Sequence, residues 1–110
     1  MLQKRIIPCL QLVKESLVKT VNYKNYKYIG DPVNTVRIFN ELEVDELCLL
    51  DIRASKDNYE PNINLLKEIA NEAFMPMSYG GGIKTLNQAK KIFSIGFEKI
   101  IINSSYSYNK

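Results

Sequence analysis

The 110-residue chain contains no histidine and no tryptophan, and only two cysteines. Without histidine, the chain cannot form Ser-His or Cys-His nucleophile pairs. A metal site is not expected, because Cys9 and Cys48 are far apart in sequence and no histidine can complete a ligand set. Each cysteine lies inside an apolar run, so both are expected to be buried thiols of a reduced protein, with no cofactor attached.

Long apolar runs and clusters of one charge are also missing. The sequence shows no signal peptide and no apolar run long enough to span a membrane, which predicts a cytoplasmic protein without membrane contact. The net charge is +3, and the lysines are dispersed rather than gathered in one run. That dispersion weighs against nucleic acid as a partner and is compatible with a phosphorylated small-molecule substrate.

Short apolar runs alternate with helical patterns along the whole chain. Strands are expected at residues 4–12, 45–52, 75–82 and 99–105, and helices at residues 30–43, 61–74 and 84–97. Strands that alternate with helices predict an α/β fold with a parallel sheet. The length suits one small domain over residues 1–110, or part of a larger one.

Local signals support the helix starts. Asp31 is a suitable N-cap before Pro32, and Thr85 with Gln88 forms the pattern of a capping box. Gly96 is a suitable helix stop. The long segment between the first strand and the first helix predicts a functional loop or a small hairpin, with residues 17–23 as one arm.

Alternation along the strands sorts side chains by face and predicts a charged base layer of Arg5, Glu46 and Lys99. Above it, the same face is expected to hold a middle layer and then an upper layer. The middle layer contains Ile7, Cys48, Ser78 and Ile101. The upper layer contains Cys9, Leu50, Gly80 and Asn103, with Gln11 above it. Charges that face a barrel interior must pair, which predicts a salt-bridged ring; the alternative is that each lies at an exposed strand start.

Glycines and short polar residues end the last two expected strands. Gly80, Gly81 and Gly82 let backbone N–H groups approach a ligand, and Asn103 and Ser104 end the neighbouring strand with side-chain donors. Glycine loops next to helix N-termini bind phosphate, which is the interpretation favoured here. The alternative for the glycines alone is a tight turn.

Six segments carry a resemblance that runs over all 110 residues: KRIIPCL, LVKTVNY, GDPV, DELCLLDI, YGGGI and KIIINSS. Together they resemble the N-terminal part of the cyclase subunit of imidazole glycerol phosphate synthase. The resemblance implies the first half of a (β/α)8 barrel, with four parallel strands and three intervening helices. It also implies a lyase of histidine biosynthesis that forms a heterodimer with a glutaminase at the barrel base and receives ammonia through the barrel interior.

The resemblance also implies roles for individual residues. Lys19 matches a catalytic lysine of the mobile first loop, and Asp51 matches an acidic position at the end of the second strand. The other matches form two groups. These are an ammonia gate of Arg5, Glu46 and Lys99, and a substrate phosphate site of Gly81, Gly82, Asn103 and Ser104.

Gln11 departs from the family pattern, in which an aspartate acts as a general acid or base at this position. An amide cannot transfer that proton, so loss of the cyclisation step is expected. In this respect the chain resembles the cyclase-like paralogues of surface-polysaccharide pathways, which deliver ammonia for amidination of a sugar. The amide therefore suggests that ammonia delivery is kept while the acceptor chemistry has changed.

Length is the second departure, because a (β/α)8 barrel takes about 200 residues or more. The second catalytic carboxylate and second phosphate site of the family lie beyond this chain, so the chain alone is not expected to catalyse. A fragment of a longer protein is the favoured explanation. The alternatives are a non-catalytic half-barrel that binds a phosphorylated ligand, and the barrel isomerase that precedes the cyclase, which ranks lower because it lacks the charged base ring.

Overall fold

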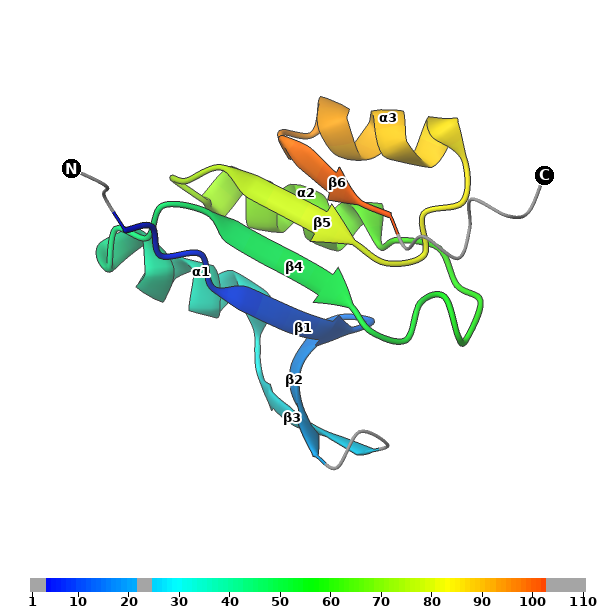
Figure 1. The fold of residues 1–110 in the computed structure, drawn as a ribbon, viewed down its shortest axis with the longest axis horizontal. Helices are drawn as coiled ribbons and strands as arrows, with labels where there is room; N and C mark the ends of the chain where they lie inside the picture. The colour runs from blue at the N-terminus through cyan, green and yellow to red at the C-terminus, as the bar shows by residue number, and fades with distance from the viewer. Residues whose placement is uncertain (1–3, 22–24, 103–110) are drawn as a thin grey trace.

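The computed structural model describes residues 4–21 and 25–102, which form one open sheet with helices packed on it (Figure 1). The elements are β1 (Cys9–Val13), β2 (Ser16–Val21), β3 (Asn25–Gly30), α1 (Pro32–Glu41), β4 (Leu47–Asp51), α2 (Ile63–Glu72), β5 (Met77–Gly80), α3 (Leu86–Ser94) and β6 (Lys99–Ile101). Their order in the sheet is β3-β2-β1-β4-β5-β6.

Four of these strands form the parallel sheet that the sequence predicts. β1, β4, β5 and β6 are parallel neighbours, and helices α1, α2 and α3 connect them in turn. β2 and β3 form an antiparallel hairpin that extends the sheet beyond β1, which confirms the hairpin expected in the long first loop. The open sheet with its helices has the form of part of a barrel, as predicted.

The hydrophobic core lies between the sheet and the helices. Side chains of alternate parity on the strands pack against the apolar faces of the helices, and α1 and α2 lie behind the sheet in Figure 1. The buried residues of this core include Leu12, Leu47, Leu49, Tyr79, Val36, Leu66, Ile69 and Ile92. The opposite face, called here the inner face, is formed by the other parity and carries Cys9, Gln11, Cys48, Leu50, Ser78, Gly80, Lys99 and Ile101.

The helix boundaries follow the predicted capping signals. The Asp31 carboxylate accepts a hydrogen bond from the N–H of Asn34 at 3.2 Å, and Pro32 opens α1. Thr85 and Gln88 form the complete capping box of α3. Gly96 follows this helix with a φ of 116°, a backbone conformation that suits glycine. The predicted helices were each longer than the observed ones by a few residues, which is the usual error at helix ends.

The first strand is shorter than predicted, because it begins at Cys9 rather than at residue 4. The preceding residues still run beside the start of β4: the N–H of Cys48 donates to the Pro8 carbonyl and that of Asp45 to the Ile6 carbonyl, both at 3.0 Å. Pro8 has no N–H to return, so regular pairing begins only after it.

The residues expected on the inner face do lie on that face, but the register between neighbouring strands differs from the expected one. The ladder pairs Cys9 with Cys48, Gln11 with Leu50, and Ser78 with Lys99, so Cys9 lies beside Cys48 rather than one layer above it. Cys9 is also exposed, contrary to the expectation that both thiols are buried, whereas Cys48 is buried. Cys9 lines an open hollow at the base of the hairpin, which leaves its thiol exposed.

A polar contact holds α1 against the end of α2. The amide nitrogen of Asn40 donates to the Glu72 carbonyl at 2.8 Å, and its oxygen accepts from the N–H of Phe74 at 2.8 Å. Arg37 adds an ion pair to the Glu72 side chain at 2.7 Å. Asn40 thus satisfies backbone groups at the C-terminus of α2 that the helix itself leaves unpaired.

Replacing Asn40 with alanine removes both of its hydrogen bonds, so we expect the free energy of unfolding to fall by about 1–3 kcal/mol. Urea denaturation of the protein measures this change. The matched control is Asn64→Ala on the exposed side of α2, which is expected to change the free energy of unfolding by less than about 0.5 kcal/mol. Equal stability of the two variants would show that the Asn40 contact contributes nothing.

Candidate functional site

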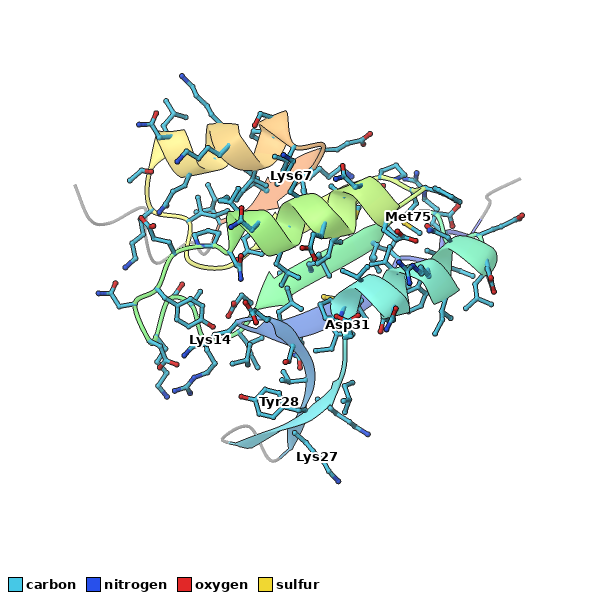
Figure 2. The ribbon with its side chains drawn as sticks, turned by 180° about the vertical axis from the view of Figure 1, so that it is seen from behind. Lys14, Lys27, Tyr28, Asp31, Lys67 and Met75 are labelled. Atoms are coloured by element: carbon cyan, nitrogen blue, oxygen red, sulfur yellow. The ribbon has the colours of Figure 1, made fainter. Side chains whose placement is uncertain are left out.

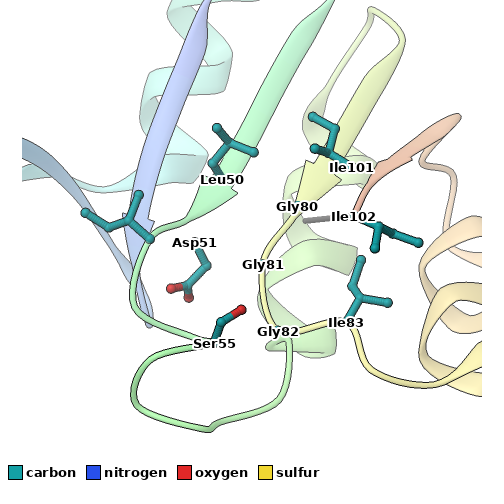
Figure 3. Close-up of a pocket in the computed structure, with 10 residues that line it drawn as sticks. Leu50, Asp51, Ser55, Gly80, Gly81, Gly82, Ile83, Ile101 and Ile102 are labelled. Carbon is teal, nitrogen blue, oxygen red and sulfur yellow. The ribbon is translucent and has the colours of Figure 1, made fainter. Parts of the chain in front are cut away.

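A cavity of about 350 Å³ opens at the carboxyl ends of β4, β5 and β6 (Figure 3). In parallel α/β sheets, ligands bind at this edge because loops and helix N-termini converge there. The groups that line the cavity are the backbone of three glycines, one carboxylate, one hydroxyl and several apolar side chains. Its lining includes Leu50, Asp51, Ser55, Gly80, Gly81, Gly82, Ile83, Ile101 and Ile102.

The Asp51 carboxylate organises the loop that follows β4. Its Oδ1 atom accepts hydrogen bonds from the backbone N–H groups of Arg53 and Ala54, both at 2.9 Å, and from the Tyr59 hydroxyl at 2.7 Å. Within residues 4–21 and 25–102, the Oδ2 atom has no hydrogen-bond partner. Asp51 therefore fixes the loop with one oxygen and leaves the other available at the cavity.

Tyr59 connects this loop to the hairpin. Its hydroxyl donates to Asp51 and accepts from the N–H of Lys14 at 3.2 Å, while the Lys14 ammonium lies 5.9 Å from the centre of the Tyr59 ring. Lys14 lies at the turn between β1 and β2, beside the loop that precedes α2 (Figure 2). Burial and the neighbouring Asp51 carboxylate raise the pKa of the Tyr59 hydroxyl, so the proton of this bridge is held firmly.

Gly81 and Gly82 are required by close packing at this edge. Both have positive φ, at 128° and 70°. A Cβ atom on Gly81 would lie 2.7 Å from the Asp51 carbonyl oxygen, and one on Gly82 would lie 2.8 Å from the Tyr59 carbonyl oxygen. The glycines thus allow the loop after β4 to close against β5, a structural role that does not depend on a ligand.

The N-terminus of α3 next to these glycines is capped by its own side chains. The Gln88 side-chain oxygen accepts from the N–H groups of Lys84 at 2.6 Å and Thr85 at 3.1 Å. The Lys84 ammonium contacts the Asn58 side-chain oxygen. In the described part of the chain, no hydrogen bond occupies the N–H of Gly82. The backbone N–H of Gly82 is therefore more available to an anion at this edge than the capped N-terminus of α3.

Gln11 and Lys19 line a different hollow, of about 310 Å³, on the inner face at the base of the hairpin. The ladder pairs Gln11 with Val18, the neighbour of Lys19. Lys19 is exposed and lies opposite Lys27 in the hairpin. The structure thus brings the predicted pair Gln11 and Lys19 together, but in a hollow whose lining does not include Asp51 or the glycines.

The predicted charged cluster forms at the amino ends of the parallel strands. A carboxylate oxygen of Glu46 lies 3.6 Å from the Arg5 guanidinium and 3.3 Å from the Lys99 ammonium. The Glu46 side chain is only 14% exposed, whereas the two cations are more than half exposed. One shielded carboxylate is therefore held between two cations at the base of the inner face.

Two predicted phosphate-site residues, Asn103 and Ser104, lie outside the described residues. Within residues 4–21 and 25–102, no group of three or more potential metal ligands is found. In the same part of the chain, no helix has the length and apolar character needed to cross a membrane. Tyr59 was not predicted as a site residue, because a tyrosine in a polar loop carries no signal of its distant contact with Asp51.

Replacing Tyr59 with phenylalanine removes the bridge between Asp51 and Lys14. Up to about pH 10 the Tyr59 hydroxyl is protonated in both the folded and unfolded states; above that pH the unfolded chain loses the proton first, because folding raises the pKa. Stability of the native protein should therefore fall as the pH rises above about 10.

In Tyr59→Phe the melting temperature should fall less between about pH 9 and about pH 11 than in the native protein. A fall should remain, because the pKa of Tyr79 is also raised by burial. Hydrogen exchange at the Lys14 amide should be faster in the variant, and amides of β4 serve as the internal control. Identical alkaline melting curves would contradict the proposed role of the Tyr59 proton.

Comparison with known proteins places the sequence of this chain in a family. The family described as "Histidine biosynthesis protein" matches residues 5–110. A relative from Pseudomonas aeruginosa, named provisionally as imidazole glycerol phosphate synthase subunit hisF2, is 61% identical over 105 residues, which cover 96% of this chain and 42% of the relative. A relative from Vibrio vulnificus, named provisionally as subunit hisF3, is 51% identical over 109 residues, covering 99% and 42%.

A third relative, from Streptococcus mutans, is named imidazole glycerol phosphate synthase subunit HisF and is 41% identical over 105 residues, covering 96% of this chain and 42% of the relative. The chain thus spans about two fifths of the length of the curated relatives it matches. Because the family match covers nearly the whole chain, from residue 5 to residue 110, the chain belongs to the histidine biosynthesis protein family.

Proposed function

We propose that this chain is the first half of a cyclase-type barrel subunit that takes ammonia from a glutaminase docked at the base of the barrel. The observation that carries the proposal is the Glu46 carboxylate held between Arg5 and Lys99 at the base of the inner face. The relatives named as subunits of imidazole glycerol phosphate synthase support the same assignment.

The charge of the base cluster suits a neutral nitrogen species. One carboxylate and two cations leave a net positive charge, which disfavours ammonium and leaves neutral ammonia as the species that passes. The exposed positions of Arg5 and Lys99 allow their side chains to move, while the shielded Glu46 stays fixed by its backbone at the start of β4. Contact with a partner at the base is the event that would rearrange these ion pairs.

The inner face above the cluster also suits a small neutral molecule. The ladder sets Cys9, Cys48, Ser78 and Lys99 at one level, and the Lys99 ammonium reaches back to Glu46 at the base. The other side chains at this level and the next, which are Cys9, Cys48, Ser78, Leu50 and Gly80, include no acidic or basic residue. Ammonia that passes along this face would reach Gln11 and then the ends of the strands, where the glycine cavity lies. There, we propose, the glycine backbone with Asn103 and Ser104 binds a phosphate of the substrate and Asp51 binds its polar groups, while Lys19 acts from the separate hollow that it shares with Gln11.

A second candidate differs only in the acceptor of the ammonia. Gln11 replaces the acid that cyclisation needs, which favours delivery of ammonia for amidination of a sugar in surface-polysaccharide synthesis. Relatives whose names carry hisF2 or hisF3 are 47–61% identical, and three relatives named HisF without a provisional mark are 40–41% identical. All of these names refer to imidazole glycerol phosphate synthase, so the second candidate rests on Gln11.

Glu46→Gln tests the proposed gate in the full-length protein paired with the glutaminase of its own cell. The amide cannot hold two cations, so Arg5 and Lys99 should separate and the base should lose its fixed geometry. We expect activity with glutamine as nitrogen donor to fall at least about tenfold, while activity with ammonium chloride stays within about twofold. Product formation with each nitrogen donor is the measurement.

The matched control is Glu98→Gln, which removes an exposed carboxylate next to Lys99 that takes no part in the ion pairs of the described residues. This variant should behave as the native protein with either nitrogen donor. If Glu46→Gln and Glu98→Gln behave alike, or if Glu46→Gln loses both activities equally, the gate proposal is wrong.

Gln11→Asp separates the two acceptors. The change restores a carboxylate at the position of the family acid, so a histidine auxotroph lacking the cyclase should grow with the full-length variant and fail to grow with the native full-length protein. Growth without histidine is the measurement, and Gln11→Asn is the control that keeps an amide. Growth supported equally by the native protein would instead assign it to histidine synthesis and exclude the changed acceptor.

A further inference from the structure

The two cysteines of the chain lie side by side on neighbouring parallel strands. The ladder between β1 and β4 pairs Cys9 directly with Cys48, and the N–H of Cys48 donates to the carbonyl of Pro8 at 3.0 Å. Cα atoms of directly opposed residues on neighbouring strands are about 4.8 Å apart. That spacing falls inside the range of about 4.4–6.8 Å over which a disulfide can form.

Both thiols are on the same side of the sheet. Leu49, the neighbour of Cys48, is fully buried under the helices, so Cys48 points to the inner face, and the register puts Cys9 on that face beside it. The thiols are close enough to interact: burial, and then the Cys48 thiol and its hydrogen bond, raise the pKa of Cys9 to about 11. The Cys9 thiolate, which is the form that attacks a peroxide, is therefore scarce at neutral pH, and oxidation should become faster as the pH rises.

The two thiols differ in access. Cys9 is exposed and lines the hollow that also holds Gln11 and Lys19, whereas Cys48 is 8% exposed. A small oxidant can therefore reach Cys9 directly, and Cys48 is the adjacent thiol that can react with the oxidised sulfur. These are the two roles that a reversible disulfide needs: an accessible first thiol and a resolving thiol beside it.

We propose that Cys9 and Cys48 are a modification site at which a peroxide forms a reversible disulfide between β1 and β4. In the first step the Cys9 sulfur attacks the peroxide, the O–O bond breaks, and Cys9 becomes a sulfenic acid while one water leaves. In the second step the Cys48 sulfur attacks the Cys9 sulfur, the S–S bond forms, and the sulfenic oxygen leaves as a second water. Two thiols lose two electrons and two hydrogen atoms, and the peroxide is reduced to two waters.

The pairing of the two thiols is independent of the proposed function, because it rests only on the register of β1 and β4. The exposure of Cys9 is that of residues 4–21 and 25–102 alone, and in a complete barrel a peroxide would reach this thiol through the barrel interior. If that function also holds, the disulfide lies on the inner face between the base cluster and Gln11. It would then join two strands of the surface along which ammonia passes.

The test uses the full-length protein, reduced and then treated with hydrogen peroxide. After treatment, peptide mapping without reduction should recover the Cys9 and Cys48 peptides joined, with a mass lower by two hydrogen atoms than their sum. Dithiothreitol should return both thiols. Non-reducing gels should show a monomeric protein, because the pair closes within one chain.

Cys48→Val removes the resolving thiol and keeps an apolar residue suited to a strand. In this variant dimedone, which traps sulfenic acids, should label Cys9 at least about tenfold more than in the native protein, because no adjacent thiol consumes the intermediate. Circular dichroism of the reduced variant confirms that the fold is kept. Cys9→Ser should give neither the joined peptides nor the dimedone adduct.

Three results would overturn the proposal. The first is a native protein in which Cys9 accumulates as sulfenic or sulfinic acid while Cys48 stays a free thiol. The second is oxidation that gives dimers linked through Cys9. The third is a native protein in which neither thiol changes under peroxide that oxidises Cys9 in Cys48→Val.

Discussion

The burial of Leu47 and Leu49 on β4 is the constraint on which the rest of the structure depends. Both are fully buried against the helices, and each contributes about 1.5–3 kcal/mol by leaving water. A shift of one residue would turn both leucines to the open face, so the register of β4 is strongly fixed. Once it is fixed, Glu46, Cys48 and Leu50 must face the other way. The polar and reactive groups of the inner face thus owe their positions to apolar side chains on the opposite face of the sheet.

At the end of β4, hydrogen bonds to the Asp51 carboxylate, rather than apolar packing, determine the path of the chain. Asp51 turns the chain through its bonds to Arg53 and Ala54, and Tyr59 returns to the same oxygen from the far side of the loop. This arrangement brings the loop so close to Gly81 that no other residue fits there. The shape of the cavity at this edge therefore depends on the hydrogen bonds around Asp51. It also depends on the glycines, which let the loop close and at the same time line the cavity.

The sequence predicted the parts that depend on local rules. Helix starts at Asp31 and Thr85 and the stop at Gly96 follow from the chemistry of neighbouring residues, and the structure confirms them. It could not predict the alignment between strands, because register is decided by packing across the sheet. Cys9 was therefore expected one layer above Cys48 and buried, and it is neither. The contact of Tyr59 with Asp51 was missed for the same reason: it joins residues through a loop whose path no local pattern specifies.

The charge of the side chains on the inner face differs from one end of the strands to the other. This difference limits which molecules could pass along the face. Glu46 and Arg5 occupy the base together with the Lys99 ammonium, whose residue is level with Ser78 and the two thiols, and Gln11 lies above them. A charged molecule would have to leave water beside groups that cannot neutralise it, which costs several kcal/mol or more. A small neutral molecule pays no such penalty. An amide at Gln11 adds no charge to this surface, where an aspartate would add a carboxylate. Under the proposed function, the residue that removes acid-base chemistry would therefore still be compatible with transfer of a neutral molecule.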